Sequence, residues 1–169
     1  AYIEYAGSEH PDGFDYIRQG RPLIVLRTFS KIYGLAGLRV GYGFAPAGVI
    51  ADLNRVREPF NVNTPAQIAA AAALEDEEHL ARSLELVEKG RRQLAERLQR
   101  LGLQVAPSGG NFVFVDAGVD SRQLFEVLLR RGVIVRSGDI FGFPTHIRVT
   151  CGTEEQNERF LTALQEVLR

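Results

Sequence analysis

The sequence predicts an α/β protein in two parts, the end of an α/β domain followed by a small α+β domain, and three observations support this. An apolar run at residues 22–29 is followed by a glycine-rich link, a second short apolar run and a helical pattern, an order typical of α/β domains. Two helical patterns then follow each other over residues 64–101. From residue 103 onward, short strand patterns alternate with two helical patterns, which is typical of an α+β unit.

The first part is expected to contain two strands and a helix. Pro22–Phe29 (PLIVLRTF) is apolar and contains β-branched residues, which indicates a buried strand of a parallel sheet. Val40–Ala45 (VGYGFA) predicts a second, short strand. Pro46 suits the first position of a helix, and the apolar residues after it have the three- and four-residue spacing of one helix face.

Two consecutive helices are expected next. Thr64-Pro65-Ala66-Gln67 combines a capping-box pattern with proline at the first helical position, so a helix is predicted from Thr64 onward. Asp76 is expected to cap a longer helix that ends at Leu101, before Gly102. Leucines and a valine form one stripe of this longer helix, so that stripe is expected to face a core while the charged residues face water.

The last part is expected to consist of short strands and two helices. Strands are predicted at residues 103–106, 111–116, 133–136 and 146–151, and a helix at residues 121–131. Thr153-Glu154-Glu155-Gln156 is a second capping-box pattern and predicts the start of a final helix. The predicted organisation is therefore the end of a larger domain at residues 1–60, interdomain helices at residues 61–101 and a small domain at residues 102–169.

Composition excludes several classes of protein. Twenty basic and 21 acidic residues give a net charge of −1, so there is no electrostatic case for binding nucleic acid or a charged membrane surface. No apolar run approaches the roughly 20 residues of a membrane span, and the first residues have neither the basic region nor the apolar core of a signal peptide, so a cytoplasmic location is expected. A single cysteine, Cys151, excludes a disulfide framework, and three dispersed histidines give no indication of a metal site.

A group of polar residues surrounds Lys31. The chain has 18 arginines and two lysines, and only a lysine amine can form a Schiff base. Lys31 directly follows the first predicted strand, Thr28 and Ser30 precede it with hydroxyls on one side, and Arg39 follows a glycine-containing stretch. Hydroxyls and a guanidinium can bind a phosphate dianion, and a neighbouring lysine can hold an aldehyde, so this group fits pyridoxal 5'-phosphate.

Residues 28–42 (TFSKIYGLAGLRVGY) resemble the cofactor-lysine signature of fold-type I pyridoxal-phosphate aminotransferases, and they are most similar to histidinol-phosphate aminotransferases. The resemblance extends from Ala1 to Arg169. It implies that residues 1–60 end the large cofactor-binding domain, and that Lys31 forms the Schiff base and shuttles a proton. It also implies that Thr28, Ser30 and Arg39 hold the cofactor phosphate and that Tyr2 hydrogen-bonds the phenolic oxygen of the cofactor.

Two arginines of the small domain are candidate substrate ligands. In His146–Thr150 (HIRVT) the strand alternation places Arg148 on the face opposite Ile147 and Val149, where it needs an anion or water. The resemblance implies that Arg148 meets the substrate's phosphate or carboxylate and that Arg136 assists it. It also implies that Asn111, near the domain cleft, binds the substrate. Two guanidiniums suit a phosphate dianion better than a monocarboxylate, which favours a phosphorylated substrate.

The predicted function is transamination of L-histidinol phosphate with 2-oxoglutarate in histidine biosynthesis. Because the chain has no methionine and the pyridine-nitrogen Asp of the family would precede Ala1, it is expected to be roughly the C-terminal half of a longer enzyme. The resemblance implies a homodimer, with residues 59–64 at its interface. Three alternatives remain open: a threonine-phosphate decarboxylase, a general or aromatic amino-acid aminotransferase, and a non-catalytic binding module of the same fold.

Overall fold

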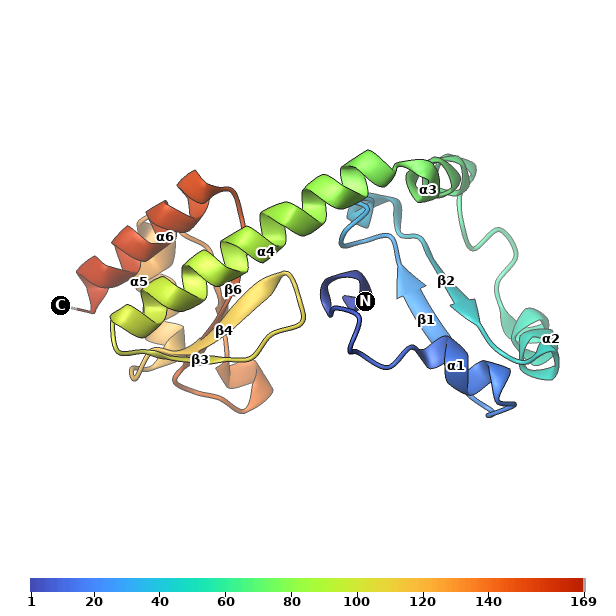
Figure 1. Cartoon of the computed structure of the whole chain (residues 1–169), viewed down its shortest axis with the longest axis horizontal. Coiled ribbons are helices and arrows are strands. Elements are labelled where there is room, and N and C mark those ends of the chain that lie inside the picture. The colour runs from blue at the N-terminus through green and yellow to red at the C-terminus, as the bar shows by residue number, and fades with distance from the viewer. Residues whose placement is uncertain (169) are drawn as a thin grey trace. The chain divides into compact units, whose positions relative to one another are not determined.

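The computed structural model describes residues 1–168, which form two compact units, Ala1–Ser83 and a second that begins at Leu84 (Figure 1). The first unit contains η1 (Ile3–Tyr5), α1 (Gly13–Arg18), β1 (Val25–Thr28), η2 (Ala36–Leu38), β2 (Gly41–Phe44), α2 (Ala47–Val56) and α3 (Thr64–Glu75). Helix α4 (Glu77–Arg100) begins in the first unit and ends in the second. The second unit continues with β3 (Gln104–Ala106), β4 (Phe112–Asp116), α5 (Ser121–Arg130), β5 (Arg136–Ser137), η3 (Asp139–Phe141), β6 (His146–Thr150) and α6 (Glu154–Val167).

The first unit contains a two-stranded antiparallel sheet. Strand β1 pairs with β2 over four residue pairs, from Val25 opposite Phe44 to Thr28 opposite Gly41. Within residues 1–168 the strand predicted at residues 22–29 therefore pairs antiparallel rather than parallel, and Leu26 is 70% exposed rather than buried. The reason lies in the connection, because residues 29–40 contain turns and a single 3-10 turn rather than the crossover helix that a parallel pair needs.

A small aromatic and alanine core holds the first unit together. Phe29 is buried, and its ring centroid lies 5.1 Å from that of Tyr33 and 5.3 Å from that of Tyr42. Ala66 and Ala70 of α3 complete this core. The start of α3 differs from the prediction, since Asn63 rather than Thr64 is the N-cap and its side chain accepts a 2.9 Å bond from the Ala66 N–H.

The second unit is a four-stranded antiparallel sheet in the order β3-β4-β6-β5, packed against the helices α4, α5 and α6. Alternate residues of the central strands point into this core, with Val113 opposite Val149 and Val115 opposite Ile147. The intervening residues share the other face of the sheet, where Phe114 stands opposite Arg148. The sheet therefore presents Arg148 on the face away from the helix core.

Two local predictions for this unit have different outcomes. The capping box at Thr153 is confirmed, because the Gln156 N–H donates to Thr153 Oγ1 and the Gln156 side chain accepts from the Thr153 N–H. The strand predicted at residues 133–136 is displaced, and only Arg136 and Ser137 pair with β6. Val133 and Val135 alternate into the core as a strand would, but they have no ladder partner in the described chain.

Cys151 is buried, and this burial raises the pKa of its thiol to about 11, so it packs as a small apolar residue. None of the helices in residues 1–168 is both long and apolar enough to cross a bilayer. The same residues contain no group of three or more His, Cys, Asp or Glu side chains suited to a metal ion.

The mixed α/β fold class predicted from the sequence is confirmed, with antiparallel rather than parallel pairing in the first unit.

Candidate functional site

Lys31 lies in a well-anchored loop between β1 and η2. Its side chain is exposed, whereas Phe29 and Ile32 on either side are 3% and 2% exposed. The Gly34 N–H donates to the Lys31 carbonyl at 3.0 Å, and the Leu35 N–H donates to the Phe29 carbonyl at 2.9 Å. Among residues 1–168 no carboxylate lies within 4.0 Å of Lys31 Nζ. The loop is thus fixed by its backbone while the Lys31 amine remains available.

Tyr2 is close to Lys31, although the two are 29 positions apart in the chain. Lys31 Nζ lies 5.4 Å from the centroid of the Tyr2 ring, a cation–π distance. Tyr2 is half-buried and immediately precedes η1. The structure therefore brings together two of the residues predicted to act on the cofactor.

The predicted phosphate ligands lie on both sides of Lys31 in the chain, Thr28 and Ser30 before it and Arg39 after it. Thr28 Oγ1 accepts a 3.0 Å bond from the Ser30 N–H, which tightens the chain at the end of β1 and leaves the Thr28 hydroxyl proton available. Arg39 follows η2 with a left-handed backbone (φ 57°), and its guanidinium donates to the Ala36 carbonyl at 2.6 Å. An arginine has five N–H donors, so Arg39 can still bind an anion.

His79, in the first turn of α4, also holds this loop and was not predicted. Its Nε2 lies 2.9 Å from the Ile32 carbonyl oxygen and 3.4 Å from Ser83 Oγ. A carbonyl oxygen only accepts hydrogen bonds, so Nε2 must carry a proton and donate to Ile32. This contact spans 47 positions, and no local pattern in the sequence reveals it.

Replacing His79 with leucine is expected to destabilise the Lys31 loop. The variant leaves the Ile32 carbonyl without this donor, which should cost about 1–2 kcal/mol of unfolding free energy. Urea unfolding measures the loss, and hydrogen exchange of residues 31–34 localises it. His79→Gln retains an N–H donor and serves as the control, and an equal loss in both variants would contradict the role of the hydrogen bond.

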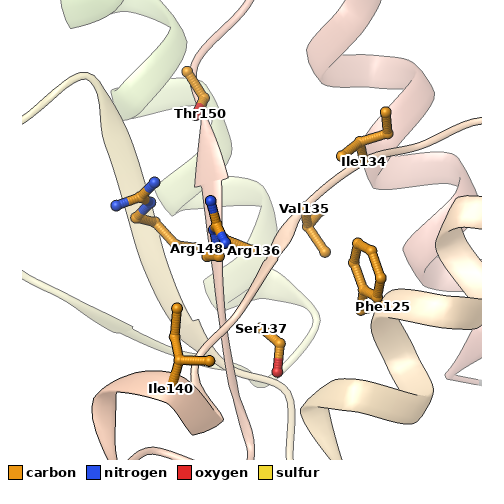
Figure 2. A pocket seen from close by; sticks show the side chains of 8 residues that line it. All are labelled: Phe125, Ile134, Val135, Arg136, Ser137, Ile140, Arg148 and Thr150. Atoms are coloured by element: carbon orange, nitrogen blue, oxygen red, sulfur yellow. The ribbon is translucent and has the colours of Figure 1, made fainter.

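Arg136 and Arg148 form the second candidate site. They are direct cross-strand partners in the β5–β6 ladder, and both line a cavity of about 450 Å³ (Figure 2). Like charges directly opposite each other destabilise a strand pair unless an anion lies between them. Within residues 1–168 neither guanidinium has a carboxylate within 4.0 Å. The pair is therefore suited to bind an external anion, and most of all a dianion.

Aromatic rings support Arg148 in place of a carboxylate. The centre of its guanidinium lies 5.1 Å from the Phe112 ring centroid and 5.9 Å from that of Phe141. These cation–π contacts orient the guanidinium without neutralising its charge. Strand alternation places Phe112 on the same face as Phe114 and Arg148, so the sequence contained a signal for it, whereas Phe141 comes from η3 and had none.

Asn111 lies next to β4 but is not one of the residues that line the arginine cavity. Its carbonyl accepts a 2.9 Å bond from the Cys151 N–H, which extends the pairing of β4 with β6 by one residue. The role observed for Asn111 among the described residues is thus a backbone one.

Comparison with known proteins gives one consistent family. The model of the aminotransferase class I and II family matches residues 1–164. Histidinol-phosphate aminotransferase of Moorella thermoacetica is 56% identical over 170 aligned residues, which cover 99% of this chain and 44% of that protein.

Two solved structures are also similar. Histidinol-phosphate aminotransferase from Sinorhizobium meliloti in complex with pyridoxal-5'-phosphate has a TM-score of 0.91 and 30% identity over 100% of this chain and 47% of that one. L-threonine-O-3-phosphate decarboxylase from Porphyromonas gingivalis has a TM-score of 0.86 and 25% identity over 99% of this chain and 53% of that one.

The chain spans about half the length of the curated relatives that it matches, and the match includes both the Lys31 loop and the strands of the arginine pair. The resemblance found at residues 28–42 is thereby confirmed at the level of the whole chain. The chain belongs to the aminotransferase class I and II family.

Proposed function

We propose that the full-length gene product is a cytoplasmic, pyridoxal-phosphate-dependent aminotransferase that transfers the amino group of L-histidinol phosphate to 2-oxoglutarate. The observation that carries this proposal is the direct pairing of Arg136 with Arg148 beside a cavity, without a carboxylate partner in residues 1–168. The names of the 56% identical relative and of the Sinorhizobium structure support the same substrate and cofactor.

The residues of the Lys31 loop fit the cofactor. Lys31 Nζ is exposed and near Tyr2, Thr28 and Ser30 supply hydroxyls, and Arg39 retains free N–H donors. When bound, pyridoxal phosphate supplies an aldehyde that condenses with amines and a ring that accepts an electron pair. Lys31 would hold that aldehyde and, once the substrate amine displaces it, remove the proton from the substrate Cα. Thr28, Ser30 and Arg39 would bind the phosphate, and Tyr2 would orient the ring.

The arginine pair would bind the other end of each substrate. Arg148 would present its planar fork to the phosphate of the amine substrate, and Arg136 would neutralise the second negative charge. The same fork would bind the α-carboxylate of 2-oxoglutarate, so one site would serve both half-reactions. The contacts with the Phe112 and Phe141 rings would hold the Arg148 guanidinium in place for this.

We also propose the domain organisation and assembly implied by the resemblance. Residues 1–60 would end the large domain, residues 61–101 would be interdomain helices, and residues 102–169 would form the small domain. The division between compact units at Ser83 falls inside that helical segment and supports this arrangement. A homodimer interface at residues 59–64 is supported by Phe60, a large apolar side chain that is 97% exposed. Its backbone is also in the left-handed region, with φ 56°.

Product analysis tests the reaction. With L-histidinol phosphate and 2-oxoglutarate, the full-length gene product loaded with cofactor is expected to form glutamate and no carbon dioxide. Dephosphorylated histidinol should react about 10²-fold less efficiently, because the arginine pair then lacks its dianion. Carbon dioxide release from O-phosphothreonine would instead establish the decarboxylase, and equal rates with and without the phosphate would favour a general aminotransferase.

A further inference from the structure

The strand that carries Arg136 is the shortest of its sheet and the least favourable electrostatically. Strand β5 has two residues, and one of its two register pairs places Arg136 opposite Arg148. Because like charges opposite each other weaken a ladder, the pairing of β5 with β6 needs support from elsewhere.

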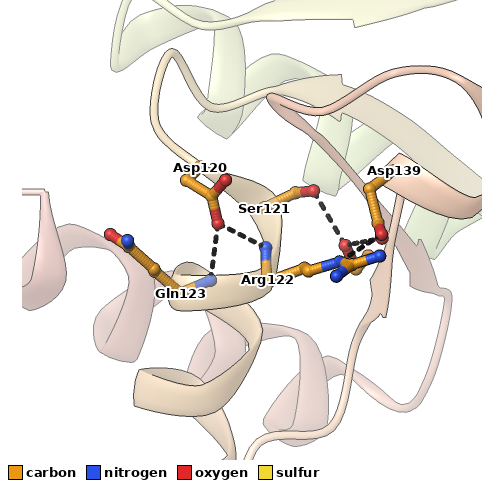
Figure 3. Close-up of polar contacts among 6 residues, drawn as sticks. Asp120, Ser121, Arg122, Gln123 and Asp139 are labelled. Carbon is orange, nitrogen blue, oxygen red and sulfur yellow. Dashed lines mark hydrogen bonds and ion pairs between the residues drawn. The ribbon is translucent and has the colours of Figure 1, made fainter.

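A hydrogen-bond chain around Ser137 provides this support. Figure 3 labels three of its members, Ser121, Arg122 and Asp139. Ser137 Oγ lies 2.5 Å from Asp139 Oδ1 and 2.7 Å from Ser121 Oγ, and Arg122 Nε donates to Asp139 Oδ2. The Ser137 bond, followed by that of Arg122, lowers the pKa of Asp139, so this carboxyl is an anion that only accepts. Ser137 therefore donates its single proton to Asp139 and accepts from Ser121.

The hydrogen bonds of Ser137 connect β5 to α5 through a buried contact. Ser121 is fully buried at the start of α5, whereas Ser137 is half-buried and lines the arginine cavity. On the other side, the Gly138 N–H donates to the His146 carbonyl at 2.7 Å, so close that a Cβ at position 138 would lie 2.5 Å from that oxygen. The two residues after Arg136 are thus held by α5 and by β6.

We propose that Ser137 is a positioning residue whose hydroxyl, tied to Ser121 and Asp139, keeps Arg136 paired with Arg148 and so maintains the anion cavity. The inference rests on the proposed function in that it takes the substrate phosphate as the ligand of this cavity. Ser137 does not bind that phosphate itself, because its only proton is directed to Asp139.

The test uses the full-length gene product loaded with pyridoxal phosphate, so that the cofactor's own phosphate site is filled. In Ser137→Ala, the inhibition constant of inorganic phosphate and the KM for the phosphorylated amine are each expected to rise about tenfold, the effect of losing a hydrogen-bonded support. The kcat should stay within about twofold, because Lys31 is unaffected. Amide exchange of residues 133–143 should become faster.

Three further variants make the result decisive. Ser137→Thr retains the hydroxyl and suits a strand, so phosphate inhibition should return to the parent value. Thr153→Ala removes a helix-capping hydroxyl elsewhere in the same unit and should leave phosphate inhibition unchanged. The proposal is overturned if phosphate inhibits Ser137→Ala as strongly as the parent and the amides of residues 133–143 exchange at the parental rate. It is also overturned if Thr153→Ala weakens phosphate inhibition as much as Ser137→Ala does. If Arg148→Ala leaves phosphate inhibition unchanged, the proposed anion site fails, while the exchange of residues 133–143 still tests the role of Ser137.

Discussion

Lys31→Arg is expected to reduce the kcat for transamination by at least about 10³-fold. Arginine retains the positive charge and the contact with the Tyr2 ring, but its guanidinium can neither condense with an aldehyde nor accept a proton at neutral pH. Absorbance of the bound cofactor and steady-state rates measure the effect. Borohydride treatment of the parent should attach the cofactor to the peptide that contains Lys31, and the variant should give no such adduct.

The chain offers a matched control for this substitution. Lys89 is its one other lysine, and its amine forms an exposed ion pair with Glu154 at 3.3 Å. Lys89→Arg makes the same chemical change on the surface and should retain parental rates and the borohydride adduct. Turnover by Lys31→Arg at the parental rate, or attachment of the cofactor to Lys89, would refute the assignment.

Arg148→Ala is expected to lower kcat/KM for the phosphorylated substrate by about 10²–10³-fold, which corresponds to about 3–4 kcal/mol. The variant removes the bidentate fork and leaves Arg136 alone beside the cavity. Arg148→Lys should recover only part of the loss, because an ammonium supplies charge without the fork geometry. Most of the effect should appear in KM, since Arg148 contacts neither the Cα proton nor Lys31 in the proposed reaction.

Salt dependence and a surface arginine complete this second test. Arg130 is exposed at the end of α5, so Arg130→Ala should leave kcat/KM within about twofold. The parent should lose affinity for inorganic phosphate as the salt concentration rises, and Arg148→Ala should show a weaker dependence. Equal values of kcat/KM in Arg148→Ala and the parent would remove the main support for a phosphorylated substrate.

The sequence predicted the parts of the site that depend on local order. The Lys31 loop was recognised because its hydroxyls, glycines and arginine all fall within residues 28–39, and Arg148 because strand alternation separates it from Ile147 and Val149. The elements themselves follow from short-range patterns, as the confirmed capping box at Thr153 shows. These features need only the chemistry of neighbouring residues.

What the sequence did not predict depends on contacts between distant residues. The antiparallel return of β2 to β1 is decided by the path of residues 29–40, which an apolar run cannot reveal. His79 reaches Ile32 across 47 positions, and Phe141 reaches Arg148 from η3. Strand β5 is shorter than its alternating pattern suggests, because only Arg136 and Ser137 meet a partner.

The opposed guanidiniums of Arg136 and Arg148 also connect ligand binding to the melting behaviour of the protein. A dianion that binds only the folded state adds RT ln(1 + [L]/Kd) to its stability, about 2.7 kcal/mol at one hundred times Kd. In the proposed function the bound dianion would also cancel the repulsion across β5 and β6, so the second unit should be most stable while substrate is present. The concentration of the phosphorylated substrate would then affect how long the enzyme stays folded as well as how fast it turns over.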